Sequence, residues 1–320
     1  MRVVFLGTPD WAVPSLRALV EDGQHVAGVV TAPDKPAGRS SRPRPSPVKQ
    51  VAQELGLDPI LQPRTLKSKE VRASILELEP EVLAVVAYGK ILPGRLLDAP
   101  RFGAVNLHFS LLPRHRGASP VQHTLLAGDE RAGVSTMVMD RGLDTGPVLL
   151  QESTAVEPGE KSRQLGERLA QLGAPLLART LRGLGDGSVT PQPQDDRRAT
   201  EAPLLTREMG HVHWEEPAAA IAGRIRAFDP WPPVVARCAK GTLRLLDASC
   251  ANPGPEDPAD AAPGTVLGRR GEALVVACGD GRRLVVERVQ PEGRRPMPGA
   301  ACLAGRYAAV GERLGDGKSP

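Results

Sequence analysis

Short apolar runs alternate with helical patterns through the first half of the chain. Because apolar runs rich in β-branched residues favour strands, we expect strands at residues 2–6, 26–31, 82–87, 104–108 and 134–139. Serine followed by proline begins two helical stretches, at Ser46 and Ser119, and suits the unpaired amides of a first helical turn. A longer helical pattern covers residues 162–184. Strands that alternate with helices predict a Rossmann-like α/β domain with a mostly parallel sheet.

The pattern changes after the long helix. Residues 188–204 are polar and proline-rich without periodicity, which is typical of a linker. A helix is expected at 218–227, followed by short β runs at 234–238, 242–247, 265–267, 273–277 and 283–288. Their regular spacing and Gly/Pro turns predict a small OB-like β-barrel. We therefore expect a Rossmann-like domain over 1–189, a linker over 190–208 and a smaller barrel domain over 209–320.

Composition narrows the class of protein. With 320 residues, 41% of them hydrophobic, the chain can bury a sizeable core, and it lacks the run of about 18 apolar residues that a membrane span needs. The first residues, MRVVFLGTPD, enter a strand without the apolar region of a signal peptide, so we expect a cytoplasmic protein. The four cysteines, Cys238, Cys250, Cys278 and Cys302, have neither C-x-x-C spacing nor nearby histidines, so we expect small buried residues and no zinc site.

The first turn argues against two common nucleotide-binding classes. It reads G-T-P-D-W, without the G-x-G-x-x-G pattern of a dinucleotide site, and no P-loop occurs in the chain. A nicotinamide or flavin dehydrogenase therefore loses its main support.

Polar side chains interrupt the predicted strand 104–108. Asn106 and His108 alternate along it, so they share one face at the carboxyl end, where open parallel sheets bind ligands. An amide donor and an imidazole can stabilise an oxyanion and move a proton. Asp144, in the sequence GLDTGP after the next strand, could orient His108 or hold a water molecule. The competing interpretation is structural: polar groups that cap a strand end and an aspartate that forms a turn.

Two apolar stretches would line the same crevice. Ser110, Leu111, Leu112 and Pro113 follow the histidine directly, and Val86, Tyr88, Gly89, Ile91 and Leu92 end a neighbouring strand. Each is ordinary strand or loop sequence when taken alone.

Positive charge is concentrated in places, although the net charge of +4 is mild. Residues 32–49 read APDKPAGRSSRPRPSPVK, and we expect a loop without regular structure whose cations, Lys35, Arg39, Arg42, Arg44 and Lys49, face the single acid Asp34. Such a loop either is simply solvated or grips phosphates and orders on binding. Arg114 and Arg116 either hold phosphates or another anionic ligand group or form structural salt bridges. Six arginines in the barrel either contact a nucleic-acid backbone or are ordinary surface charge: Arg269, Arg270, Arg282, Arg283, Arg294 and Arg295. His211 and His213 alternate, but no third ligand is near, so we interpret them as structural.

Taken together, the motifs carry a family resemblance. GTPDWAVPSL, VVAYGKIL, N-L-H-x-S-L-L-P-R-x-R-G, GLDTGPVL and RAFDPWP occur in this order along nearly the whole chain. In this the chain resembles the methionyl-tRNA formyltransferase family, whose N-x-H and Asp residues are shared by the wider group of enzymes that use 10-formyltetrahydrofolate. The resemblance implies transfer of a formyl group from 10-formyltetrahydrofolate to the α-amine of initiator methionyl-tRNA, for translation initiation, without a metal. No feature of the sequence calls for a membrane or for more than a monomer.

The resemblance also implies roles for residues. Asn106 would donate to the oxyanion, and His108 with Asp144 would move the proton, either of the two being the base. The folate would lie along residues 85–92 and 110–113, and the tRNA would meet Lys35, Arg39, Arg42 and Arg44 and the barrel. Phe109 departs from the family, which has a small residue there; by alternation its ring should point away from Asn106 and His108.

Other classes remain to be separated. A formyltransferase that acts on an amino-sugar nucleotide would need no RNA, and a hydrolase would pass the formyl group to water. A non-catalytic RNA-binding protein would have no use for the three residues Asn106, His108 and Asp144.

Overall fold

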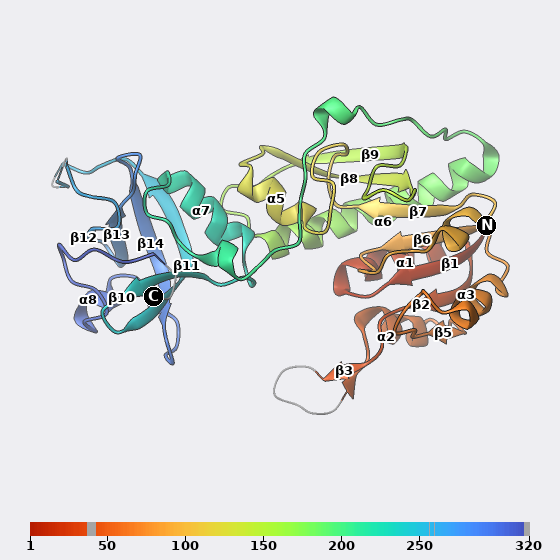
Figure 1. The fold of residues 1–320 in the computed structure, drawn as a ribbon, viewed down its shortest axis with the longest axis horizontal. Helices are drawn as coiled ribbons and strands as arrows, with labels where there is room; N and C mark the ends of the chain where they lie inside the picture. Colours follow the sequence, from red (N-terminus) through yellow and green to blue (C-terminus); the bar gives the residue numbers. More distant parts are fainter. Residues whose placement is uncertain (37–42, 256, 259, 317–320) are drawn as a thin grey trace. The chain divides into compact units, whose positions relative to one another are not determined.

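The computed structural model describes residues 1–36, 43–255, 257–258 and 260–316 (Figure 1). The chain forms two compact units. The first contains Met1–Pro120, Arg131–Ala155 and Gly166–Pro203, and the second contains Val121–Glu130, Val156–Leu165 and Leu204–Pro320. Residues 190–203, part of the segment that resembles a linker in sequence, therefore pack within the first unit.

A seven-stranded sheet forms the centre of the first unit, in the order β5-β2-β1-β6-β7-β8-β9 (Figure 1). Its strands are β1 (Arg2–Gly7), β2 (His25–Val30), β5 (Ile60–Leu61), β6 (Val82–Val86), β7 (Ala104–His108), β8 (Arg131–Val138) and β9 (Val148–Ala155). β5, β2, β1, β6 and β7 run parallel, while β8 and β9 are antiparallel to their neighbours. The predicted Rossmann-like, mostly parallel sheet is confirmed; the sequence patterns missed β5 and β9.

Helices follow most of the strands, and two of them begin where Ser46-Pro47 and Ser119-Pro120 predict. They are α1 (Val13–Glu21), α2 (Pro47–Glu54), α3 (Lys69–Leu76), α4 (Gly94–Asp98), α5 (Pro120–Leu126) and α6 (Ser162–Asp186), with short 3-10 turns at Asp10–Ala12, Asp196–Arg198 and Glu208–Gly210. The Ser46 side chain accepts a hydrogen bond from the Lys49 amide at 3.1 Å, as its position before Pro47 predicts. The residues Val3–Leu6 and Val82–Ala84 are fully buried, so the core lies along the central strands.

Two glycines bring α6 close to the sheet. A Cβ at Gly173 would lie 2.7 Å from a methyl group of Leu107, and one at Gly166 would lie 2.0 Å from the ring of Trp11. The Trp11 ring in turn packs against Phe109, with 5.7 Å between ring centroids. Leu107 and Phe109 therefore both lie toward α6, which leaves the opposite face of β7 to Asn106 and His108.

The second unit contains an antiparallel barrel. Its strands β10 (Val234–Cys238), β11 (Gly241–Ala251), β12 (Val266–Arg270), β13 (Ala273–Ala277) and β14 (Arg283–Pro291) follow the order β10-β11-β14-β13-β12, and β15 (Met297–Pro298) pairs with β14. Helices α7 (Ala218–Ala227) and α8 (Ala301–Ala304) complete it. Residues 311–315 pair with Thr265 and Val266 on one side and with Arg237 on the other, which closes the barrel between β12 and β10. The predicted small β-barrel is confirmed; its closing segment was not predicted.

The basic stretch 32–49 is more regular than its composition suggests. β3 (Lys35–Pro36) pairs antiparallel with β4 (Pro43–Arg44), and α2 begins at Pro47. The helix start agrees with the Ser46-Pro47 signal, but the expectation of a stretch without regular structure was wrong at Lys35–Pro36 and Pro43–Arg44, because backbone pairing needs no particular side chain. Elsewhere, no helix among the described residues is both long and apolar enough to span a membrane.

Candidate active site

The strand β7 presents Asn106 and His108 at the carboxyl edge of the sheet. β7 lies between the parallel strand β6 and the antiparallel strand β8, with Asn106 opposite Met137 and His108 opposite Ser135. His108 is 5% exposed, and Asn106 is half-buried. The structure thus brings the two predicted residues to the edge where parallel sheets bind ligands.

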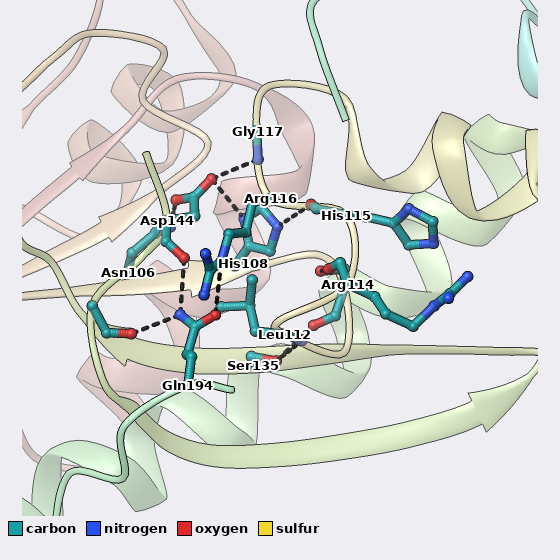
Figure 2. A network of polar contacts seen from close by, with 12 residues as sticks. Asn106, His108, Leu112, Arg114, His115, Arg116, Gly117, Ser135, Asp144 and Gln194 are labelled. Carbon is teal, nitrogen blue, oxygen red and sulfur yellow. Dashed lines mark hydrogen bonds and ion pairs between the residues drawn. The ribbon is translucent and has the colours of Figure 1, made fainter. Parts of the chain in front are cut away.

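The ring of His108 is held on both sides (Figure 2). Its Nε2 lies 2.9 Å from the carbonyl oxygen of His115, and its Nδ1 lies 3.6 Å from Oδ2 of Asp144. A carbonyl can only accept, so Nε2 carries a proton. Nδ1, on the side of Asp144, is then the ring nitrogen that can exchange a proton with a bound reactant.

Asp144 joins the same cluster from the loop between β8 and β9. Its Oδ2 accepts a hydrogen bond from the Gly117 amide at 2.9 Å, and its Oδ1 lies 3.5 Å from Nδ2 of Asn106. Asp144 has a left-handed backbone, with φ of 53°. A Cβ at the nearby Gly146 would lie 1.9 Å from the carbonyl oxygen of Val138, so only glycine fits where this loop returns to the sheet. The three residues predicted from widely separated motifs therefore meet.

Gln194 supports the loop of Asp144, a role that the sequence patterns did not predict. Its side-chain amide donates to the carbonyl oxygens of Asp144 at 2.8 Å and of Gly146 at 2.7 Å. Its own Oε1 accepts from Nε of Arg116 at 3.0 Å (Figure 2). Gln194 lies in the polar stretch with linker-like composition, so only its tertiary contacts reveal this position.

The Ser110–Pro113 turn is fixed by two polar side chains from β8 and β9. Ser135 Oγ donates to the Ser110 carbonyl at 2.6 Å and accepts from the Leu112 amide at 3.0 Å. Gln151 donates to the Leu112 carbonyl at 2.9 Å. Sequence reasoning missed both residues, although a serine in the buried run GVSTMV was a usable signal.

The predicted folate wall after β6 has both buried and open members. Val86, Tyr88 and Leu92 are buried, whereas Gly89 is exposed and Ile91 is 92% exposed. Burial raises the pKa of Tyr88 to about 12, so its phenol stays neutral at physiological pH. Left-handed backbone at Ala87 and Gly89 turns the chain out of the sheet and leaves Ile91 on the surface.

The two arginines after the turn differ in their surroundings. Arg116 forms an ion pair with Asp196 at 2.8 Å besides its hydrogen bond to Gln194, and its side chain is 11% exposed. Of its two interpretations, the structure favours the structural one. Arg114 is exposed.

Three polar side chains form a partly buried cluster next to the paired strands β3 and β4. Lys49 Nζ contacts Oδ2 of Asp34 at 2.8 Å and Oε1 of Gln62 at 2.7 Å. Nε2 of Gln62 in turn donates to Oδ1 of Asp34 at 2.7 Å. The hydrogen bonds that Asp34 accepts, from Lys49 first and Gln62 second, lower the pKa of its carboxyl group. Lys49 is thus engaged with Asp34, while Lys35 and Arg44 are exposed on the paired strands above it. Arg39 and Arg42 lie outside the described residues.

The six arginines of the barrel differ in their exposure to solvent. Arg283 is 1% exposed; it pairs with Asp257 at 3.2 Å and donates to the carbonyl of Pro258, so its assignment to a basic surface was wrong. Five of the six arginines are exposed, namely Arg269, Arg270, Arg282, Arg294 and Arg295.

In the part of the chain that the structure describes, the histidines and cysteines of the second unit form no metal site. His213 lies 3.5 Å from Asp316, and no cluster of metal-ligating side chains occurs among the described residues. All four cysteines are free; Cys278 and Cys302 are buried, whereas Cys238 and Cys250 are only partly so.

Comparison with known families defines the class. The model of the formyl transferase family matches residues 1–181, and that of the formyl transferase C-terminal domain matches residues 204–307. Among solved structures, the sugar 3N-formyl transferase WlaRD shares the fold with a TM-score of 0.63 at 15% identity, covering 89% of this chain and 97% of that one. The methionyl-tRNA formyltransferase from Clostridium thermocellum gives 0.54 at 16% identity, over 78% of this chain and 93% of that one.

Sequence relatives narrow the class further. The methionyl-tRNA formyltransferase of Pelobacter propionicus is 43% identical, with 98% of this chain and 96% of the relative covered. That of Methylococcus capsulatus is 44% identical, with 98% and 100% covered. The chain therefore belongs to the methionyl-tRNA formyltransferase family.

Proposed function

We propose that this protein transfers the formyl group of 10-formyltetrahydrofolate to the α-amine of initiator methionyl-tRNA, which gives the N-formylmethionyl-tRNA that starts translation. The observation that carries the proposal is the meeting of Asn106, His108 and Asp144 at the carboxyl edge of the sheet, in a chain similar to methionyl-tRNA formyltransferases over nearly its whole length. We expect a cytoplasmic monomer.

The chemistry follows from the groups at this edge. The amine attacks the formyl carbon, and the carbonyl electrons move to oxygen. Nδ2 of Asn106 donates a hydrogen bond to that oxyanion, since a fixed amide donor stabilises charge that develops in a transition state. The proton released by the amine passes to the His108–Asp144 pair and is returned to N10 as the C–N10 bond breaks. No step calls for a metal ion.

The folate is a co-substrate, and the surroundings of the site fit it. Ile91 exposes 92% of an apolar side chain beside the exposed backbone of Gly89, and such a side chain can cover an aromatic ring. We place the folate along Val86, Tyr88, Gly89, Ile91 and Leu92 and along Ser110–Pro113. The buried residues of this set would support the loops, whereas Gly89 and Ile91 would contact the folate directly.

The RNA would meet the paired strands β3 and β4. Lys35 and Arg44 are exposed on them, and the Asp34–Lys49 pair anchors their base. Cations held on an anchored hairpin suit phosphate binding, because less chain entropy is lost on contact. We assign the same role to Arg39 and Arg42, between the two strands.

The fate of a labelled formyl group tests the proposal. The protein is mixed with 10-[¹⁴C-formyl]tetrahydrofolate and one of three acceptors: methionyl-tRNA, an amino-sugar nucleotide or water alone. The proposal predicts label in formylmethionyl-tRNA. Label transferred to the sugar nucleotide, or released as formate at the same rate with and without methionyl-tRNA, would overturn it.

A further inference from the structure

We propose that residues 194–202, here called the positioning segment, set the geometry of the His108–Asp144 pair: Gln194 acts on Asp144, and Thr200 acts on His108 through His115. The inference rests on the proposed function, because it concerns the same reaction. It assigns a catalytic contribution to a stretch whose sequence is polar, proline-rich and without periodicity.

Gln194 fixes the backbone from which the Asp144 carboxylate projects. Its amide group bridges the carbonyls of Asp144 and Gly146, at 2.8 and 2.7 Å, on either side of Thr145. Asp144 has a left-handed backbone, which is unfavourable for a residue other than glycine unless its surroundings hold it. The two hydrogen bonds supply such a restraint.

Arg116 determines which way the Gln194 amide faces. Its Nε donates to Oε1 of Gln194 at 3.0 Å, and its Nη2 pairs with Asp196 at 2.8 Å. Because arginine can only donate, the oxygen of Gln194 must face Arg116 and the NH₂ group must face the loop carbonyls. The amide orientation therefore follows from chemistry, and both carbonyls receive a donor.

Thr200 fixes the carbonyl that holds the His108 ring. Its Oγ1 accepts from the His115 amide at 2.8 Å, and the His115 carbonyl accepts from Nε2 of His108 at 2.9 Å. His115 is 5% exposed and left-handed, with φ of 58°. Thr200 is thus hydrogen-bonded to His115, whose backbone is left-handed and whose carbonyl determines which nitrogen of the His108 ring carries the proton.

Backbone pairing holds Thr200 in register with this loop. The amide of Arg116 donates to the Thr200 carbonyl at 2.8 Å, and the amide of Ala202 donates to the Arg116 carbonyl at 2.7 Å. A Cβ at Gly117 would lie 2.4 Å from the Ala202 carbonyl oxygen, so the two chains approach as closely as glycine allows. The Gly117 amide is also the donor to Asp144. Displacing the segment would therefore move the partners of both members of the pair.

Four variants test the proposal. Gln194→Leu removes the donors to the Asp144 loop, and Gln192→Leu is its matched control, since Gln192 is exposed and its side chain donates a hydrogen bond to Thr190 and not to the Asp144 loop. Thr200→Val removes the hydroxyl at constant size, and Thr200→Ser retains it. We expect Gln194→Leu and Thr200→Val to lower kcat about 10- to 100-fold, since displacement of about 1 Å is that costly. KM for both substrates and Tm should change little, and Thr200→Ser and Gln192→Leu should keep the wild-type kcat.

The side-chain ¹⁵N resonances of His108 give a reading that does not depend on the substrate. Thr200→Val should shift the Nε2 resonance, and Thr200→Ser should restore it. Loss of activity that follows loss of Tm, or failure of Thr200→Ser to restore kcat, would overturn the inference. If the wild type formylates no methionyl-tRNA, the proposed function fails, and the resonances alone then decide: an unchanged Nε2 signal in Thr200→Val would refute the positioning role.

Discussion

At the scale of single residues, the side chains along β7 alternate between the site on one face and the core on the other. Asn106 and His108 face the site, while Leu107 and Phe109 pack toward α6, so the aromatic ring that departs from the family pattern lies away from the reacting groups. Phe109 is 5% exposed against Trp11. Its size therefore serves the core beneath the site.

Burial also determines the reactivity of the cysteines. It raises the pKa of Cys278 to about 12 and that of Cys302 to about 11, so both remain thiols at pH 8, and their thiolates appear only as the pH approaches those values. We predict that iodoacetamide at pH 8 leaves both unmodified in the native protein, labels the half-buried Cys250, and labels all four after denaturation, as read by peptide mass spectrometry. Equal labelling of Cys278 before and after denaturation would contradict this.

At the scale of elements, the close contact of α6 with the sheet depends on glycine. Alanine normally favours a helix, but a Cβ at Gly166 would overlap the rigid ring of Trp11. We predict that Gly166→Ala lowers the free energy of unfolding by about 1–3 kcal/mol, as overpacking does. Denaturant unfolding provides the measurement.

A second glycine in the same helix is the control. Gly185 is exposed, and a Cβ there would meet only Met1, at the ordinary distance of 3.7 Å. Gly185→Ala should be neutral or stabilising by about 0.5 kcal/mol. If both substitutions had the same sign, the packing explanation would be wrong.

A further prediction concerns Arg44, which is exposed on the paired strands β3 and β4. Arg44→Ala should raise KM for methionyl-tRNA several-fold, leave KM for the folate unchanged, and reduce the slope of log KM against log salt by about 1, the effect of one lost phosphate contact. Arg101→Ala is the matched control, because Arg101 is exposed but precedes β7, at the opposite edge of the sheet. Equal effects of the two substitutions, or an equal loss of folate binding, would refute the assignment.

At the scale of the whole molecule, the end of the chain completes the barrel. Leu314 is 1% exposed, and residues 311–315 pair with both Val266 and Arg237. Truncation after Val310 should therefore lower the Tm of the barrel, because it opens a sheet edge and uncovers core. Calorimetry of the truncated and the full-length chains provides the measurement. Identical melting of the two forms would show that the segment does not close the barrel.

The sequence patterns predicted features that depend on neighbouring residues in the chain, and they missed features that depend on tertiary contacts. β7, α7 and the capped start of α2 agree with the apolar periodicity and capping residues, and Asn106, His108 and Asp144 lie together as expected. Gln194 and Thr200 escaped prediction because their importance comes from hydrogen bonds to residues distant in the chain. Polar residues outside the apolar pattern leave no periodic signal.

If the strand-end residues perform the transfer, loss of the Asn106 amide must slow the chemical step itself, which single-turnover kinetics of Asn106→Ala measure. With enzyme in excess over methionyl-tRNA, the rate of formyl transfer reports the chemical step without product release. We predict a rate lowered about 10²–10³-fold, the usual cost of one oxyanion donor, with folate affinity unchanged. Transfer at the wild-type rate by Asn106→Ala would contradict it.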